Sequence, residues 1–301
     1  MKNTILFFII ALLFINCKKE KKANEKLNVV TTTSMITDLV KNIGGEHINL
    51  QGLMGSGVDP HLYKASEGDV SKLANADIIF YNGLHLEGKL VEVFEKMKNI
   101  KTIAISDALD KNTLIGSEYF ASNYDPHIWF NVTYWKQATK FITDKLSEAI
   151  PEKKAIFQTN SASYLKQLDA LQQELETTIK SLPKEKRILV TAHDAFNYFG
   201  KAFNFKVVGL QGLSTATEAG VQDVQKLSSF IIENDVKSIF IESSVPKRTI
   251  EALQAAVNSK GHNVTIGGSL YSDALGNAGT IEGTYIGMFK YNVNTIVNAL
   301  K

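Results

Sequence analysis

Short, continuous apolar runs alternate with amphipathic stretches in the first half of the chain. The amphipathic stretches MITDLVKNIGG and SEGDVSKLANA favour helices, and the second begins with Ser66 and Asp69 at the spacing of a capping box. Apolar runs without polar alternation, separated by helices, are typical of a parallel sheet covered on both faces. The predicted strands are LNVVTTT (27–33), INLQGLMG (48–55), DIIFYNG (77–83) and KTIAIS (101–106).

The second half of the chain repeats this plan. Four apolar runs again alternate with helical patterns, and a last helix closes the chain at 283–301. The predicted fold class is therefore α/β, with two domains that each hold a four-stranded parallel sheet flanked by helices. The predicted strands are RILVTA (187–192), FKVVGL (205–210), KSIFIES (237–243) and HNVTIGG (262–268).

A long helix is predicted between the two halves. The stretch from Pro151 to Pro183 contains no glycine and no internal proline, and its apolar residues recur largely at three- and four-residue steps. We expect an N-terminal domain at 27–150, a rigid connecting helix at 151–183 about 45 Å long, and a C-terminal domain at 184–301. A stiff connection predicts small domain closure. The apolar positions are Ile156, Tyr164, Leu168, Leu171, Leu175 and Ile179.

The N-terminus has the pattern of a targeting segment. Lys2 precedes an apolar run from Ile5 to Ile15, which is shorter than the about 20 residues that span a bilayer. Cys17, the single cysteine, follows directly, so we expect a lipoprotein-type signal peptide at 1–17, lipidation of Cys17 and a flexible tether at 18–26. Ile15 and Asn16 stand where small residues usually precede such a cysteine, and an uncleaved membrane anchor is the alternative. Both interpretations place the folded body outside the cytoplasm, held to a membrane.

Composition and charge exclude one class of partner. With 44% hydrophobic and 21% charged residues among 301, the chain is an ordinary globular protein with a net charge of +2. Residues 1–22 hold five lysines and one glutamate, so the remainder is slightly acidic, at −2. A slightly acidic body lacks the basic surface that binds nucleic acid.

Three histidines and one aspartate follow predicted strands or precede predicted helices. His61 and His127 come from the first half, and His193 and Asp273 come from the second. In open parallel sheets, ligands bind beyond the carboxyl ends of the strands. These four side chains are therefore expected to line a cleft between the two domains.

Two of these histidines stand in the same tripeptide, Asp-Pro-His, at 59–61 and 125–127. Proline fixes φ and restrains the preceding Asp, so each tripeptide predicts a stiff turn that presents its histidine in one orientation. The Asp can also accept a hydrogen bond from the imidazole nitrogen not used for binding. His85, in NGLHLEG, is a rival candidate. His47 and His262 are expected to be exposed and without a role.

With these motifs, the chain resembles the substrate-binding lipoproteins of zinc and manganese ABC importers, in particular the TroA-like members of metal-binding cluster A-I. The resemblance extends from Leu27 to the C-terminus. It is carried by GVDPHLYKAS, YNGLHLEG, YDPHIWFNV, TAHDAFNYFGKAF, LSTATEAGVQD, IFIESSVPKRTIEAL and SLYSDALGNAGTIEGTYIGM. It implies that one divalent transition metal binds to His61, His127, His193 and Asp273.

The resemblance also implies partners and a location. The partners are the permease and ATPase of an ABC importer in the membrane, and the protein is expected to be a monomer. The location is extracytoplasmic, as a membrane-anchored lipoprotein of a bacterial cell envelope, on the periplasmic side or the outer surface. The anchor would be a lipid on Cys17.

The expected cargo is zinc or manganese, with iron also considered. Three imidazoles suit Zn²⁺, and a carboxylate that binds through both oxygens also accommodates Mn²⁺ or Fe²⁺. Dedicated zinc members of the family often carry a His- and acid-rich loop before the second Asp-Pro-His, but residues 109–123 contain no histidine. We therefore expect a site that accepts both Zn²⁺ and Mn²⁺, with Zn²⁺ bound more tightly in vitro and manganese a credible cargo in the cell.

Two other function classes compete with transport. A zinc hydrolase needs an open metal position for water, whereas four protein ligands close a four-coordinate site. The chain also lacks an H-E-x-x-H helix, a nucleophile elbow and a Gly-rich phosphate loop, so no enzyme is expected. A surface adhesin or scaffold with a structural metal is the other alternative. Reversible metal exchange separates it from transport.

Overall fold

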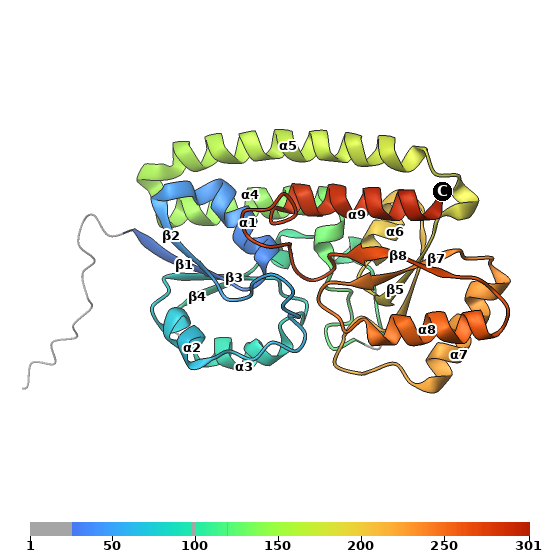
Figure 1. Ribbon diagram of the computed structural model, residues 1–301. Helices are drawn as coiled ribbons and strands as arrows, with labels where there is room; N and C mark the ends of the chain where they lie inside the picture. The colour runs from blue at the N-terminus through green and yellow to red at the C-terminus, as the bar shows by residue number, and fades with distance from the viewer. Residues whose placement is uncertain (1–25, 98–99, 119) are drawn as a thin grey trace, which may run out of the picture.

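The first half contains one parallel sheet, as predicted. The computed structural model describes residues 26–97, 100–118 and 120–301. Its first sheet has the strand order β2-β1-β3-β4, and the connecting helices α1, α2 and α3 lie between successive strands (Figure 1). The predicted capping box opens α2, with Ser66 and Asp69 each accepting from the backbone N–H of the other. The bounds are β1 Leu27–Thr31, α1 Ser34–Gly44, β2 Ile48–Gly52, α2 Glu67–Ala74, β3 Ile78–Tyr81, α3 Gly88–Lys96 and β4 Lys101–Ala104.

The second half contains all four predicted strands but pairs them differently from the prediction. Within residues 184–301, all of which are described, β5 pairs with β6 and β7 pairs with β8, each in parallel. Strands β5 and β7, both fully described, lie next to each other, but no hydrogen-bonded ladder joins them. The described chain has the predicted α/β fold, and its second set of four strands forms two hydrogen-bonded pairs rather than one continuous ladder. The bounds are β5 Ile188–His193, α6 Asn197–Phe203, β6 Lys206–Gln211, α7 Val221–Glu233, β7 Ser238–Glu242, α8 Arg248–Ser259 and β8 Thr265–Leu270.

A long helix lies across both halves, as the prediction of a connecting helix required. Helix α5 (Lys154–Lys180) has 27 residues, which is about 40 Å. In Figure 1 it runs along the top of the molecule over α9 (Tyr285–Leu300), and it also contacts α1 and α4 (Val132–Ala149). Its buried face contains the predicted apolar positions, except that Phe157 takes the place expected for Ile156.

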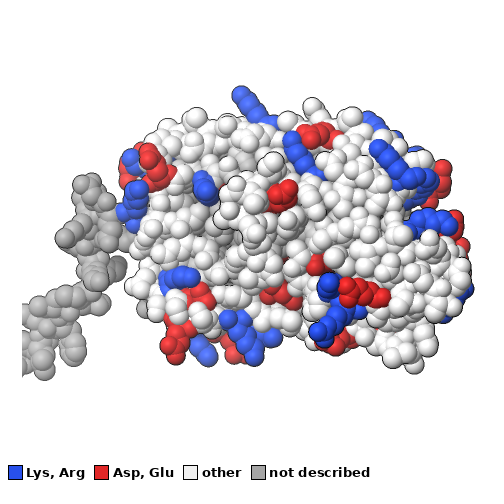
Figure 2. All heavy atoms as spheres, in the orientation of Figure 1, with Lys and Arg blue, Asp and Glu red and all other residues white. Residues whose placement is uncertain are grey.

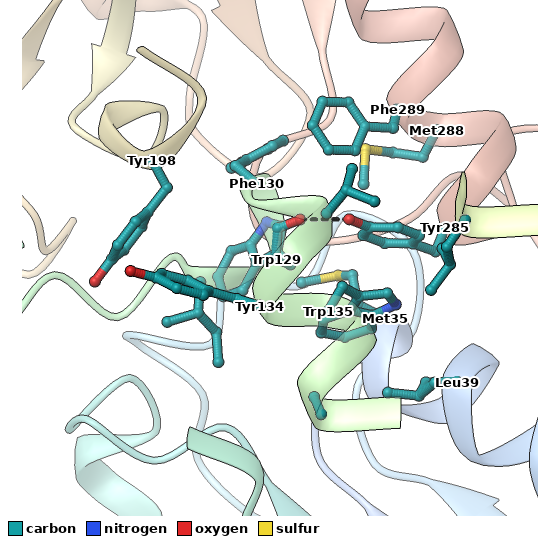
Figure 3. Close-up of a cluster of buried hydrophobic side chains, with 14 of the residues drawn as sticks. Met35, Leu39, Trp129, Phe130, Tyr134, Trp135, Tyr198, Tyr285, Met288 and Phe289 are labelled. Carbon is teal, nitrogen blue, oxygen red and sulfur yellow. Dashed lines mark hydrogen bonds between the residues drawn. The ribbon is translucent and has the colours of Figure 1, made fainter. Parts of the chain in front are cut away.

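The two halves share one hydrophobic core. Figure 3 shows side chains from α1, α4, α9 and the turn before α4 packed together. The rings of Trp135 in α4 and Tyr285 in α9 are stacked with centroids 4.7 Å apart. The Tyr285 hydroxyl also donates to the Trp129 carbonyl oxygen at 2.7 Å. A continuous, close-packed core resists relative motion of the parts that it joins.

The N-terminal predictions fall outside this description. The predicted signal peptide at 1–17, with Cys17, and residues 18–25 of the predicted tether lie outside the described residues. No helix in the described part of the chain is both long and apolar enough to cross a membrane. On the face drawn in Figure 2, basic and acidic side chains are interspersed rather than gathered by sign.

Candidate metal centre

The two Asp-Pro-His segments share one local hydrogen bond. In each, the Asp carboxylate accepts the backbone N–H of the histidine two residues later, at 2.8 Å in the first turn and 2.9 Å in the second. His61 lies in the loop between β2 and α2. His127 is followed at once by a 3₁₀ turn, Ile128–Phe130, and then by Asn131, whose side chain caps α4.

The two Asp residues differ in whether they contact the imidazole ring of their own turn. His127 Nδ1 lies 2.7 Å from Asp125 Oδ1, which confirms the predicted support of the ring by its Asp. In the first turn, Asp59 Oδ2 instead accepts the Thr215 hydroxyl at 2.5 Å. The prediction that both Asp residues hold their own imidazoles is therefore correct for the second turn alone.

His193 is supported by Glu242, a residue that our sequence analysis did not identify. His193 is the last residue of β5, and its Nδ1 lies 2.5 Å from Oε2 of Glu242, the last residue of β7. The other oxygen of Glu242 accepts the His193 N–H at 2.8 Å. A carboxylate that ends a strand in IFIES was the available signal, since the carboxyl ends of neighbouring parallel strands meet at one edge.

The structure brings the four predicted side chains together. His61, His127, His193 and Asp273 are all buried, and each offers a ligand atom within 4.8 Å of the other three. The Nε2 atoms of His61 and His127 are 3.3 Å apart, and His193 Nε2 lies 3.2 Å from Asp273 Oδ2. In the described part of the chain, this is the one group of three or more His, Cys, Asp or Glu side chains so arranged.

The other three histidines lie elsewhere. The rival candidate His85 is exposed on the loop after β3, with its ring against Phe120. His47 and His262, predicted to be exposed, are half-buried. His47 meets Phe157 edge-on, and His262 Nε2 is within hydrogen-bond distance of the Val236 carbonyl oxygen.

Burial and close charges shift the pKa values of His61, His193 and Asp273. Burial disfavours the charged form of His61 and lowers its pKa to about 3, and the neighbouring histidines act in the same direction. Burial also opposes protonation of His193, but the carboxylates of Asp273 and Glu242 outweigh it and hold its pKa well above the usual value. Burial alone would raise the pKa of Asp273, yet the nearby histidines, His193 above all, lower it.

Two of the atoms that could bind a metal at this centre have no hydrogen-bond partner. They are His193 Nε2 and Asp273 Oδ1, both buried. A buried polar atom without a partner is unfavourable, and a cation between the four groups would satisfy both atoms. With their Nδ1 atoms against carboxylates, His127 and His193 present Nε2 to this centre. Three imidazole nitrogens and one carboxylate form a donor set for Zn²⁺, Mn²⁺ or Fe²⁺.

One family model matches nearly the whole described chain. The model, described as zinc-uptake complex component A, periplasmic, matches residues 29–299.

Two curated relatives are equally similar to this chain but are named for different metals. The manganese-binding lipoprotein MntA of Bacillus subtilis (strain 168) is 48% identical over 282 residues, which cover 93% of this chain and 92% of the relative. The zinc-binding protein TroA of Treponema pallidum (strain Nichols) is 48% identical over 283 residues, covering 94% and 91%. The solved structure of the periplasmic zinc binding protein TroA from Treponema pallidum superposes with a TM-score of 0.89. It is 49% identical, with 92% of this chain and 99% of that chain covered.

Proposed function

The chain belongs to the family of zinc-uptake complex component A proteins, and from this premise we propose that it supplies metal to an ABC importer. It captures one divalent transition metal ion outside the cytoplasm and delivers the ion to the membrane permease. The metal is cargo, so the site must hold it firmly and also release it.

The observation that carries this proposal is the buried cluster of His61, His127, His193 and Asp273. Two ligands come from each half of the chain, and two of the donor atoms have no other partner. We propose all four as metal ligands, bound through His Nε2 atoms and the Asp273 carboxylate. We also propose residues 27–150 and 184–301 as two domains, which residues 151–183 connect. The long α5 supports this division.

The cargo we propose is Zn²⁺ or Mn²⁺. At nitrogen and oxygen ligands Zn²⁺ binds more tightly than Mn²⁺, whatever the cell transports. The manganese-binding and the zinc-binding relatives are each 48% identical to this chain, which supports a site able to take either ion. Competition titrations under anaerobic conditions with Zn²⁺, Mn²⁺ and Fe²⁺ test this. A site that binds no Mn²⁺ at millimolar concentration would leave zinc as the sole cargo.

Transport fits the site better than catalysis or scaffolding. Four protein donors around one ion leave no position for an activated water, which a zinc hydrolase needs. A scaffold with a structural metal would not exchange its ion. A transporter component exchanges it reversibly, and a strain without the gene recovers growth when metal is added to the medium.

We propose that the protein acts at the outer side of a bacterial membrane, anchored by lipid on Cys17, as a monomer beside its permease and ATPase. The lipoprotein MntA, 48% identical, supports an anchored location. The net charge of −2 outside residues 1–22 supports a partner other than nucleic acid.

Metal-dependent stability tests the proposal. A ligand that binds the native state alone stabilises it by RT ln(1 + [L]/Kd), about 2.7 kcal/mol at a metal concentration of 100 Kd. Full-length protein in mild detergent, stripped with chelator, should therefore gain melting temperature when Zn²⁺ or Mn²⁺ is added. His61→Ala should lose most of this gain, while the matched control His85→Ala, an exposed histidine outside the cluster, should keep it. Full stabilisation of His61→Ala would overturn the ligand assignment.

A further inference from the structure

The first Asp-Pro-His turn is tied to the opposite half of the molecule by a single side chain. Both oxygens of Asp59 are engaged, Oδ1 by the His61 N–H at 2.8 Å and Oδ2 by the Thr215 hydroxyl at 2.5 Å. Thr215 is 156 residues further along the chain and is buried. Among described residues, and apart from contacts between the four metal-site side chains, this is the one hydrogen bond from residues 55–62 to the second half.

The loop that carries Thr215 is itself fixed in the second half. Residues 212–220 connect β6 to α7, and the buried Gln211 at the end of β6 donates from Nε2 to the Thr217 carbonyl oxygen at 3.2 Å. The Gly212 carbonyl oxygen accepts the N–H of Asp194, the residue after His193. The loop that carries Thr215 is therefore fixed next to His193, and the Thr215 hydroxyl donates from this loop to Asp59.

The first turn also lies nearest to solvent. His61 is 5% exposed and Leu62 is 43% exposed, whereas His127, His193 and Asp273 are at most 1% exposed. A bound ion leaves when its ligands detach, and the ligand on the most exposed and least tethered turn is the one that can detach first.

We propose that Thr215 is a positioning residue for metal retention. Its hydroxyl holds Asp59, Asp59 holds the backbone of His61, and the His61 imidazole is thereby kept on the ion. The hydrogen bond forms when the turn is closed over the ion and breaks when the turn swings out, so it slows release. This inference rests on the proposed metal site and adds a residue that does not touch the ion.

Thr215→Val tests the proposal because it removes the hydroxyl with little change in shape. The matched control is Thr217→Val, at an exposed threonine of the same loop whose described hydrogen bond uses its backbone. Full-length protein in mild detergent is loaded with Zn²⁺ or with Mn²⁺ and mixed rapidly with excess chelator. Loss of a hydrogen bond to a charged group predicts dissociation about 10-fold faster in Thr215→Val and unchanged dissociation in Thr217→Val.

Three further measurements separate positioning from general stability. The association rate should match the wild type, because the hydrogen bond is proposed to slow release. The metal-free protein should remain folded, with its melting temperature lowered by no more than the loss of one hydrogen bond. Thr215→Ser retains the hydroxyl and should restore slow release. Wild-type release rates in Thr215→Val, or fast release in Thr215→Ser, would overturn the inference while leaving the metal site intact. A wild-type protein that binds neither metal would instead overturn the proposed function.

Discussion

The turns at 59–61 and 125–127 share a tripeptide and an Asp–His backbone hydrogen bond, but they differ in how the rest of the molecule holds them. In both, one carboxylate oxygen accepts the histidine N–H and the other is bound by a side chain from the second half, Thr215 or Asn197. The repeated Asp thus has two tasks. It shapes its own turn and joins that turn to the far side of the site.

The second turn and the residues after it make hydrogen bonds that have no counterpart at the first turn. Asp125 is fully buried, and its carbonyl oxygen accepts the Tyr198 hydroxyl at 3.0 Å. The Pro126 carbonyl oxygen accepts from Asn82 Nδ2 at 2.9 Å, and Trp129 Nε1 donates to the Ser272 carbonyl oxygen beside Asp273. The same tripeptide is therefore held by more contacts at 125–127 than at 59–61. If both histidines bind the ion as proposed, His127 would be the fixed ligand and His61 the exchangeable one.

Removing the carboxylate from each turn should separate their roles most strongly. Asp125→Ala leaves the buried amides and imidazole of the second turn unpaired, so the free energy of unfolding of the metal-free protein should fall by about 3 kcal/mol. Asp59→Ala, at a half-buried position, should cost about 1 kcal/mol or less. Urea denaturation of chelator-treated protein measures both. Equal losses would show that the two turns are anchored alike.

Glu242→Gln sharpens the comparison from the other half of the site. Glu242 supports His193 with one oxygen on the backbone N–H and the other near Nδ1, whereas Asp125 uses Oδ1 for both of these groups of His127. The amide removes the negative charge but keeps the shape, so metal affinity should fall by about 10- to 100-fold, the usual effect of changing a partner of a ligating histidine. Competition titration against a chelator of known affinity measures the change. Unaltered affinity would mean that Glu242 has no part in metal binding.

The smallest expected change is in overall shape. If release depends on the first turn, the two halves need not separate widely, and the shared core and the 27-residue α5 oppose such motion. Small-angle scattering curves of metal-free and metal-bound protein should nearly coincide. A large domain rotation on metal binding would contradict a local release route.

Periodicity was enough to predict the long helix and every strand among the described residues. Continuous apolar runs mark buried parallel strands, and the spacing from Tyr164 to Ile179 marks one face of α5. The first position of that face was wrong, since Phe157 is buried and Ile156 is half-buried. Adjacent apolar residues at the start of a helix leave its phase undetermined. The apolar pattern also does not determine which strands of the second half pair, since it marks the strands but not their hydrogen-bonded neighbours.

The candidate site was predicted as a set of side chains but not as a network. Strand-end positions indicated that His61, His127, His193 and Asp273 would share a cleft, and the structure brings them together. Glu242 ends a strand, which was a usable signal, but its two contacts with His193, 49 positions away, were not predicted. Thr215 acts on Asp59, 156 positions away, through one hydrogen bond, and no local pattern encodes such a contact.

Crystallography of the metal-loaded protein with anomalous scattering tests the central claim most directly. Data collected on either side of the zinc or manganese absorption edge locate the ion itself. We expect one ion among His61, His127, His193 and Asp273, about 2.0–2.2 Å from each histidine Nε2 and from the Asp273 carboxylate when the ion is Zn²⁺. An anomalous peak outside this cluster, or an ion within it that lacks His61 or Asp273 as a ligand, would contradict the proposed site.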